Sequence, residues 1–414
     1  MTDTNELKHA VVLSGGGADG AYEVGVMKAL FNGKALIMGG PVEPDIFTGT
    51  SIGAFNAALL VSQWDEYGTA AIATLENIWR ETLADRLERT GNGGFRFRLN
   101  PFDFLNPRNY VPNPFQPMLQ LAEDGLYVSW EALRRFVGLV QSTAPLAERI
   151  LELFDLTAIV SREPLEQTVH ETIQLENIRR SQKALIIAAT NWNSGELKLY
   201  RNNDMTENLG PRAILASAAI PGFYPPTEVG AQPFVDGGVV LNTPLLPAVE
   251  AGADILHVIY MDPDVSNIPQ KDLGSTLQTM YRMQVIGWAR LINREVDHDQ
   301  TLNRAARILG QLDPQVTKTI EDFFFTRDPD SKFAHRLKRP PERREITIHR
   351  YHPYENFGGL LGFLNTDRDR IARLIDQGFD DAVYHDCAES GCVLAGDPLQ
   401  AASPETVPQP GLQE

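Results

Sequence analysis

Three short segments of this chain hold the residue types that acyl transfer requires. They are Gly15 to Gly20 (GGGADG), Gly49 to Gly53 (GTSIG) and Phe234 to Gly238 (FVDGG). The second segment places a serine between two glycines, the third places an acid before two glycines, and the first offers several glycine N–H groups. A nucleophile, a base and donors for a developing negative charge are the parts of a serine hydrolase.

The candidate nucleophile is Ser51, at the centre of a Gly-x-Ser-x-Gly sequence. The residues before it are typical of a buried strand, and those after it have helical spacing, which is the context of a nucleophile elbow. Such an elbow holds the serine in a strained backbone conformation with its hydroxyl exposed. Gly49 and Gly53 flank the serine, and we expect that any side chain at these two positions would clash.

The first segment offers Gly15, Gly16 and Gly17 between a strand and a helix. Free backbone N–H groups at a helix N-terminus, aligned with the helix dipole, can stabilise an oxyanion. The same residues, with Gly20, also match the dinucleotide pattern Gly-x-Gly-x-x-Gly. That interpretation needs an acid at the end of the second strand to hold a ribose, and the serine elbow occupies this place instead. No Gly-Lys-Ser/Thr follows, which excludes a phosphate-binding P-loop.

The serine needs a base, and two kinds of candidate are present. Several histidines lie downstream, none of them in a distinctive motif: His257, His298, His335, His349, His352 and His385. Asp236 is more distinctive, because it ends an apolar strand and Gly237 and Gly238 let the chain turn tightly behind it. An aspartate before glycine also commonly caps its own turn, so the motif alone leaves the base open.

The surrounding pattern predicts a parallel sheet covered by helices. Strand-like runs alternate with helical runs at residues 9–14, 21–31, 45–48 and 52–63. Residues 183–190 read as a buried strand that turns through 193–195 into a hairpin partner at 196–201. A helix at 244–251 then precedes a core strand at 254–261. This β-α-β-α rhythm indicates an α/β fold.

Taken together, these motifs resemble the patatin-like phospholipase family. The Gly-rich loop, the Gly-x-Ser-x-Gly elbow and the Asp-Gly-Gly loop occur in the family's order, and three further stretches match its usual pattern: 14–26, 217–226 and Asn242-x-Pro244. The resemblance covers roughly 9–262 and a final strand and helix at about 345–384. It implies a three-layer α/β/α fold with a mostly parallel central sheet and helical insertions, and a lipid acyl hydrolase of phospholipase A, lysophospholipase or esterase type without a cofactor.

The resemblance further implies a Ser-Asp dyad with no histidine. Ser51 is then the nucleophile and Asp236 its base, and Gly15, Gly16 and Gly17 form the oxyanion hole. The other motif glycines support this geometry: Gly20, Gly49, Gly53, Gly237 and Gly238. An ordinary carboxylate is a poor base for serine, so Asp236 must lie in a partly dry site, where desolvation raises its basicity.

One residue departs from the family pattern. The family usually carries Arg or Lys where this chain has Asp19. We expect an acid there to repel phosphate and to favour uncharged acyl esters or monoacyl lipids over anionic phospholipids. The same residue favours an alternative function, a catalytically weak patatin-fold protein that binds lipid or a partner.

The extent of the family resemblance sets the predicted domain organisation. We predict an N-terminal extension (1–8), a catalytic core (9–262) with an irregular Phe/Pro-rich insertion at 91–117, a helical insertion and basic loop (263–340), a C-terminal strand and helix that complete the catalytic domain (341–390), and a disordered acidic tail (391–414). The helical insertion should contain a long helical region at 273–312 with a break. The Phe/Pro-rich insertion is either core filling or an apolar lip at the substrate entrance.

Charge and hydropathy restrict the partners. The 414 residues carry 37 Lys and Arg against 54 Asp and Glu, a formal charge of −17, which disfavours nucleic-acid binding. Eight of these acids follow Arg373, the last basic residue. No apolar stretch reaches the roughly 20 residues of a membrane span, and residues 1–6 lack the features of a secretory signal, so we expect a cytoplasmic protein. Residues 327–350 hold eight basic residues against four acids and offer a surface for peripheral contact with an anionic membrane.

Cysteine usage predicts no disulfide framework. The two cysteines, Cys387 and Cys392, lie close together near the C-terminus. With His385 they suggest a metal site, but the neighbouring sequence has no second ligand pair at zinc-type spacing, and we therefore expect no metal.

Overall fold

The computed structural model describes residues 7–85, 93–98, 115–141, 160–261, 276–354, 357 and 362–396. Its main sheet contains the strands β1 (His9–Leu13), β2 (Ile46–Thr50), β5 (Ala184–Asn191), β6 (Leu197–Arg201), β7 (Thr227–Val229), β8 (Gln232–Asp236), β9 (Ile255–Ile259) and β10 (Thr347–Tyr351). The strand order is β10-β9-β1-β2-β5-β8-β7, and β6 also pairs with β5. β3 (Arg96–Phe97) and β4 (Val160–Ser161) form a separate antiparallel pair.

The helices connect these strands and cover the sheet. They are α1 (Ala21–Phe31), α2 (Ile52–Tyr67), α3 (Ala71–Ile78), α5 (Gln116–Gln141), α7 (Glu163–Thr172), α8 (Leu175–Arg180), α9 (Gly210–Ser217), α10 (Leu245–Glu250), α11 (Thr276–Gln311), α12 (Pro314–Arg327), α13 (Lys332–Leu337) and α15 (Arg368–Val383). A π-helical turn at Trp79–Leu83 extends α3.

The sheet is parallel from β10 through β9, β1 and β2 to β5. The hairpin partner β6 and the pair β8–β7 are antiparallel. Parallel neighbours require crossover connections, and the predicted alternation of strands and helices supplies them. The prediction of a mostly parallel α/β sheet is confirmed.

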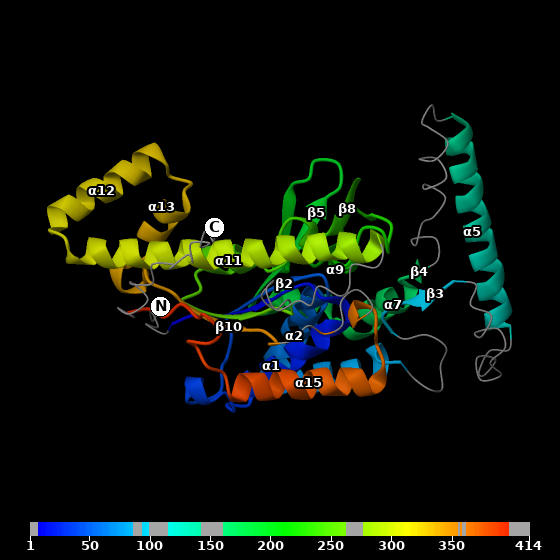
Figure 1. Ribbon diagram of the computed structural model, residues 1–414, viewed down its shortest axis with the longest axis horizontal. Coiled ribbons are helices and arrows are strands. Elements are labelled where there is room, and N and C mark those ends of the chain that lie inside the picture. Colours follow the sequence, from blue (N-terminus) through cyan, green and yellow to red (C-terminus); the bar gives the residue numbers. More distant parts are fainter. Residues whose placement is uncertain are drawn as a thin grey trace, which may run out of the picture.

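The two faces of β1 show how the layers form. Val11 and Leu13 belong to a core shared with α1, α2 and α15, whereas Ala10 and Val12 belong to a second core shared with α10 and α11. Successive strand residues point to opposite faces, so an uninterrupted apolar strand must be covered on both. Figure 1 shows α1, α2 and α15 on one side of the sheet and α11 on the other.

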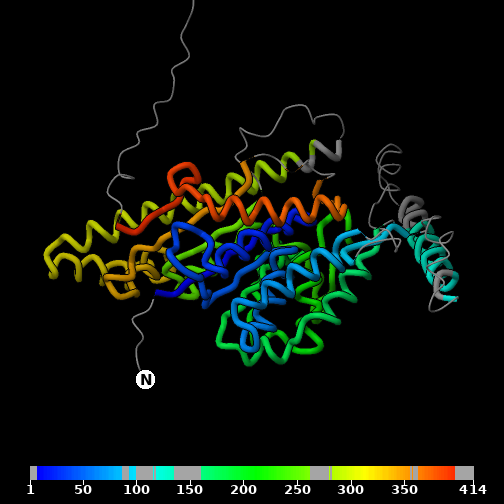
Figure 2. Tube along the Cα trace, turned by 90° about the horizontal axis from the view of Figure 1, so that it is seen from below, coloured from blue at the N-terminus to red at the C-terminus, as the bar shows by residue number. Residues whose placement is uncertain are grey.

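The first and the last described helices of this domain pack directly against each other. α1 and α15 lie side by side in both views, the former blue and the latter orange (Figures 1 and 2). A Cβ at Gly25 would stand 1.9 Å from the Ile375 carbonyl oxygen, and one at Gly378 would stand 2.1 Å from the Tyr22 carbonyl oxygen. Glycine at both positions therefore brings the two backbones into contact.

The predicted elements agree closely with the structure in the core. The helix at 21–31 has the predicted bounds, and the hairpin at 183–201, the helix at 244–251 and the final strand and helix are confirmed. The predicted break in the long helical region is wrong, because α11 is one continuous helix. Most of the 91–117 insertion lies outside the described residues, including Phe102 and Phe104.

The predicted start of the disordered tail at 391 is also wrong. Cys392 and Val393 are buried, and Val393 pairs with Ile348 of β10 in an antiparallel bridge. Packed chain therefore continues past residue 391, whereas 397–414 lie outside the described residues.

Four of the eight basic side chains at 327–350 form ion pairs within the protein. The pairs are Arg336 with Asp299, Arg339 and Arg343 with Asp254, and Arg344 with Glu321. Arg350 donates hydrogen bonds to Tyr260 and Asn293. Side chains held in internal pairs contribute little attraction to a membrane surface, so the charge count alone overstates that attraction. Within the described ranges, no helix is both long and apolar enough to cross a membrane.

Candidate active site

Ser51 lies at the tight turn between β2 and α2. Its φ of 56° and ψ of −126° make it the one non-glycine residue with positive φ in the described chain. A Cβ at Gly49 would stand 2.4 Å from the Gly53 carbonyl oxygen, and one at Gly53 would stand 2.7 Å from the Leu13 carbonyl oxygen. Both glycines are thus needed for the end of β2 to turn into α2 against the end of β1. This is the geometry predicted for a nucleophile elbow.

Ser217 secures the backbone of this turn. The Ser51 N–H donates to Ser217 Oγ at 2.9 Å, and the Ser217 hydroxyl donates to the Ala188 carbonyl oxygen at 2.7 Å. Ser217 lies within the stretch 217–226 that matches the family pattern, but no local pattern predicts this contact, because only the packing of α9 against β5 brings the two serines together. The strained residue is therefore tied to the sheet through one buried hydroxyl.

Asp236 ends β8 and is almost fully buried. Its Oδ1 accepts from the Gly238 N–H at 2.7 Å, while Oδ2 has no partner of ordinary hydrogen-bond geometry in the described chain. Burial raises the pKa of Asp236 to about 7, and interactions with the Ser51 hydroxyl and the Gly238 N–H oppose this rise. The structure therefore brings Ser51 and Asp236 together, and it keeps one carboxylate oxygen available.

The two glycines after Asp236 permit close packing. A Cβ at Gly237 would stand 2.4 Å from the Ala188 carbonyl oxygen, and one at Gly238 would stand 2.8 Å from Asn242 Oδ1. The chain turns here through a 3-10 turn at Gly237–Val239. Asp236 caps this turn through Oδ1. The same residue therefore both caps its own turn, as the sequence allows, and lies close to Ser51.

The Gly-rich loop lies directly beside Ser51. A Cβ at Gly15 would stand 3.0 Å from the Ser51 Cβ. The Gly15 N–H donates to the Asn242 carbonyl oxygen, and Asn242 Nδ2 donates to the Gly15 carbonyl oxygen, both at 3.2 Å. The Gly15 N–H is thus engaged, whereas no acceptor for the Gly16 or Gly17 N–H is found within the described chain. Gly17 has φ of 56°, a conformation that favours glycine.

Asp19 does not face the site as a free negative charge. It is buried and forms an ion pair with Arg370 of α15, which also donates to the Phe357 carbonyl oxygen at 2.9 Å. Burial raises the pKa of Asp19 to about 6, and Arg370 opposes that rise. The expected repulsion of phosphate assumed a free charge at Asp19, and this charge is paired with a residue 351 positions away in the sequence.

An apolar cavity opens beside Ser51. Its empty volume is about 550 Å³, part of it open to solvent. Most of its wall is aliphatic or aromatic, and these residues include Ile52, Trp79, Leu83, Phe95, Leu165 and Phe363. Phe95 thus contributes to this wall, as expected if the 91–117 insertion borders a substrate entrance.

The downstream histidines take no part in this arrangement. Neither Ser51 nor Asp236 has a histidine among its hydrogen-bond partners in the described chain. The histidine-dependent alternative left open by the sequence has no geometric support here.

Comparison with known proteins identifies the family. The model of the family described as "Patatin-like phospholipase" matches residues 11–249, which is more than half of the chain. The chain belongs to the patatin-like phospholipase family. This membership supports lipid acyl hydrolase activity in general, and it agrees with the three-layer α/β/α fold.

Other comparisons are less informative. The crystal structure of VipD from Legionella pneumophila is similar at 15% sequence identity and a TM-score of 0.32, over 90% of this chain and 67% of that chain. A likeness this weak bears on neither fold nor activity. No curated protein matches the chain.

The Asp19–Arg370 pair gives a direct prediction. Replacing Arg370 by Ala leaves a buried carboxylate without its partner, which should lower the free energy of unfolding by about 3 to 5 kcal/mol. The double variant Asp19→Asn/Arg370→Gln removes both charges and should recover most of that loss. Urea denaturation at pH 8 measures both. An Arg370→Ala protein as stable as wild type would contradict the assigned pairing.

Proposed function

We propose that this patatin-like protein hydrolyses carboxylic esters of lipids through Ser51 and Asp236. The observation that carries the proposal is the placement of a strained, cavity-facing serine beside a buried carboxylate of pKa about 7. A base of that pKa is partly deprotonated at neutral pH and still able to accept a proton from serine. No metal or dinucleotide takes part in this proposal.

The first half of the reaction forms an acyl-enzyme. Ser51 Oγ attacks the ester carbonyl carbon while its proton passes to the available Oδ2 of Asp236. We assign the Gly16 and Gly17 N–H groups as donors to the developing oxyanion, because the Gly15 N–H already donates to the Asn242 carbonyl oxygen. Loss of one such donor typically costs about 3 to 4 kcal/mol of transition-state stabilisation. Asp236 then returns the proton to the leaving alcohol as the carbon–oxygen bond breaks.

The second half releases the fatty acid. Asp236, again a carboxylate, takes a proton from water, and the resulting hydroxide attacks the acyl carbon on Ser51. The second oxyanion collapses, the bond to Ser51 Oγ breaks, and the proton held by Asp236 restores the serine hydroxyl. One carboxylate therefore serves as base and acid in turn.

The cavity sets the class of substrate. An apolar lining beside the nucleophile favours an acyl chain, because burial of each methylene contributes about 0.8 kcal/mol. Asp19, which had favoured a catalytically weak binding protein, is neutralised by Arg370 and so no longer argues against catalysis or against anionic lipids.

The central test is release of fatty acid from a panel of phospholipids, lysophospholipids and neutral esters. Ser51→Ala and Asp236→Asn should each reduce kcat/KM by at least about 1,000-fold, since each removes one half of the dyad. Wild-type kcat/KM should rise about tenfold per pH unit up to about pH 7 and then level off, because Asp236 must lose its proton. His257→Ala is the matched histidine control. The dyad would be contradicted if His257→Ala lost activity while Asp236→Asn remained active.

Burial of Asp236 also has a consequence for stability. A carboxyl whose pKa is raised on folding stabilises the fold below its unfolded pKa, and this contribution is lost as the pH rises through about 7. Asp236→Asn removes the buried charge, so at pH 8 it should be more stable than wild type by about 2 to 4 kcal/mol, with little difference at pH 4. A stability gain that does not depend on pH would show that Asp236 has an ordinary pKa.

We further propose that the protein acts from the cytoplasm at a membrane surface, through α5. This helix stands apart from the sheet at one end of the molecule (Figure 1). Leu119, Leu126, Trp130 and Leu133 recur at helical spacing, and Leu126 and Trp130 are 73% and 64% exposed. An exposed apolar helix face is typical of a contact with lipid.

The other face of α5 is anchored close to the cavity. Arg96 of β3 pairs with Asp124 at 2.7 Å, and the Arg98 guanidinium lies 3.9 Å from the centre of the Tyr127 ring. β3 directly follows Phe95, which lines the cavity. Lipid contact through α5 would therefore place the cavity entrance near the lipid.

Vesicle binding tests this surface. Leu126→Ser/Trp130→Ser should weaken binding to phosphatidylcholine vesicles at least about tenfold, because two apolar side chains lose their burial in lipid. Hydrolysis of a monomeric short-chain ester should stay at the wild-type rate. Met283→Ser alters a side chain of α11 that is 67% exposed and serves as control. Equal binding by the α5 variant and this control would contradict the assigned surface.

A further inference from the structure

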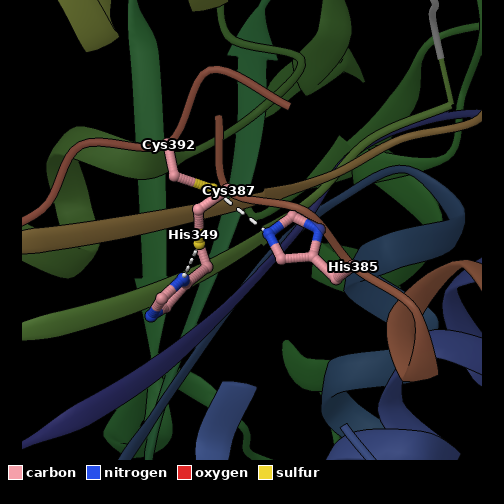
Figure 3. Close-up of side chains that lie close together, drawn as sticks. All are labelled: His349, His385, Cys387 and Cys392. Atoms are coloured by element: carbon pink, nitrogen blue, oxygen red, sulfur yellow. Dashed lines mark hydrogen bonds between the residues drawn. The ribbon is translucent and has the colours of Figure 1, made fainter. Parts of the chain in front are cut away.

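Four potential metal ligands converge beside β10, the edge strand of the main sheet. They are His349 of β10 and three residues of the segment after α15, His385, Cys387 and Cys392 (Figure 3). One ligand atom from each lies within 4.8 Å of all the others. His349, His385 and Cys392 are buried, and Cys387 is partly exposed. The sequence expectation of no metal missed His349, which the parallel sheet brings to this place.

The spacing of these atoms suits a tetrahedral zinc ion. Zinc lies about 2.3 Å from thiolate sulfur and about 2.0 Å from imidazole nitrogen, so the ligand atoms of a tetrahedron are about 3.3 to 3.8 Å apart. His349 Nδ1 is 3.4 Å from Cys387 Sγ, and His385 Nε2 is 3.2 Å from Cys392 Sγ. Small side-chain adjustments would bring all four atoms to these separations.

Neighbouring groups already orient the ligands. The Arg350 N–H donates to Cys392 Sγ at 3.2 Å, and Ser390 Oγ lies 3.4 Å from His385 Nδ1, opposite the nitrogen that faces the sulfur. His349 stacks on His257 of the adjacent strand, with 5.5 Å between ring centroids. A hydrogen-bond partner such as Ser390 fixes the tautomer of a metal-binding histidine, and a stacked ring helps to hold its orientation.

Zinc binding requires both cysteines as thiolates, so their protons would pass to solvent when the ion arrives.

We propose that His349, His385, Cys387 and Cys392 bind one structural Zn²⁺ ion. Two sulfur and two nitrogen ligands select zinc over Ca²⁺ or Mg²⁺, which prefer oxygen, and four protein ligands leave no open position for catalysis. The ion joins the segment after α15 to β10, the edge strand of the main sheet. It acts together with the Ile348–Val393 bridge, and it is independent of the proposed dyad.

Metal analysis of the full chain, purified without a histidine tag, tests this proposal. After incubation with Zn²⁺ and gel filtration, wild type should retain one zinc per chain, whereas Cys387→Ser/Cys392→Ser and His349→Ala should retain less than about a tenth of that amount. His170→Ala, on the exposed face of α7, is the histidine control and should bind zinc like wild type. Co²⁺ in place of Zn²⁺ should give the intense visible bands of a tetrahedral thiolate site.

Chelation of wild type keeps the test independent of any folding defect in the variants. Removal of zinc should lower Tm by at least about 4 °C, and added zinc should restore it. Wild type that holds no zinc after reconstitution, or that carries a Cys387–Cys392 disulfide under reducing purification, would overturn the proposal. So would zinc that remains bound in the double cysteine variant.

Discussion

The backbone at Ser51 is the constraint on which the candidate site depends. A non-glycine residue at positive φ costs on the order of 1 to 3 kcal/mol, and it persists only where its surroundings fix it. Here β2 enters the turn, α2 leaves it, Gly49 and Gly53 allow the backbones to touch, and the Ser217 hydroxyl holds the Ser51 N–H. Each part belongs to the sheet or to a helix packed on it, so the whole α/β core maintains the conformation of one serine.

The same core determines the chemistry of Asp236. β8 ends against β5, and Gly237 lets the following turn lie on the Ala188 carbonyl group, which leaves the carboxylate nearly without solvent. Desolvation raises the pKa of Asp236, and the cost of keeping this charge buried falls on the stability of the fold. Basicity and stability thus oppose each other at this residue, which is common at catalytic sites.

Local patterns predicted most of the core, and the resemblance to the patatin-like family implied that Ser51 and Asp236 act together. Strand and helix periods, and glycines at tight turns, are properties of neighbouring residues, and they placed α1 and the hairpin at 183–201 correctly. Contacts between distant segments were not predictable in this way. Arg370 of α15 pairs with Asp19, Asn242 binds the Gly15 backbone, and His349 of β10 lies beside the two cysteines. Only the folded chain brings these residues together. The internal partners of four arginines in the basic run are likewise contacts that local sequence does not predict.

The most direct test of the central claim is the rate at which a fluorophosphonate labels Ser51, located by peptide mass spectrometry. The probe reacts with a serine oxygen whose proton has been removed, so it reports on the dyad without depending on the lipid chosen. Wild type should be labelled at Ser51, at a rate that rises up to about pH 7, and Asp236→Asn should react at least about 100-fold more slowly. Labelling at another residue, or an unchanged rate in Asp236→Asn, would contradict the account.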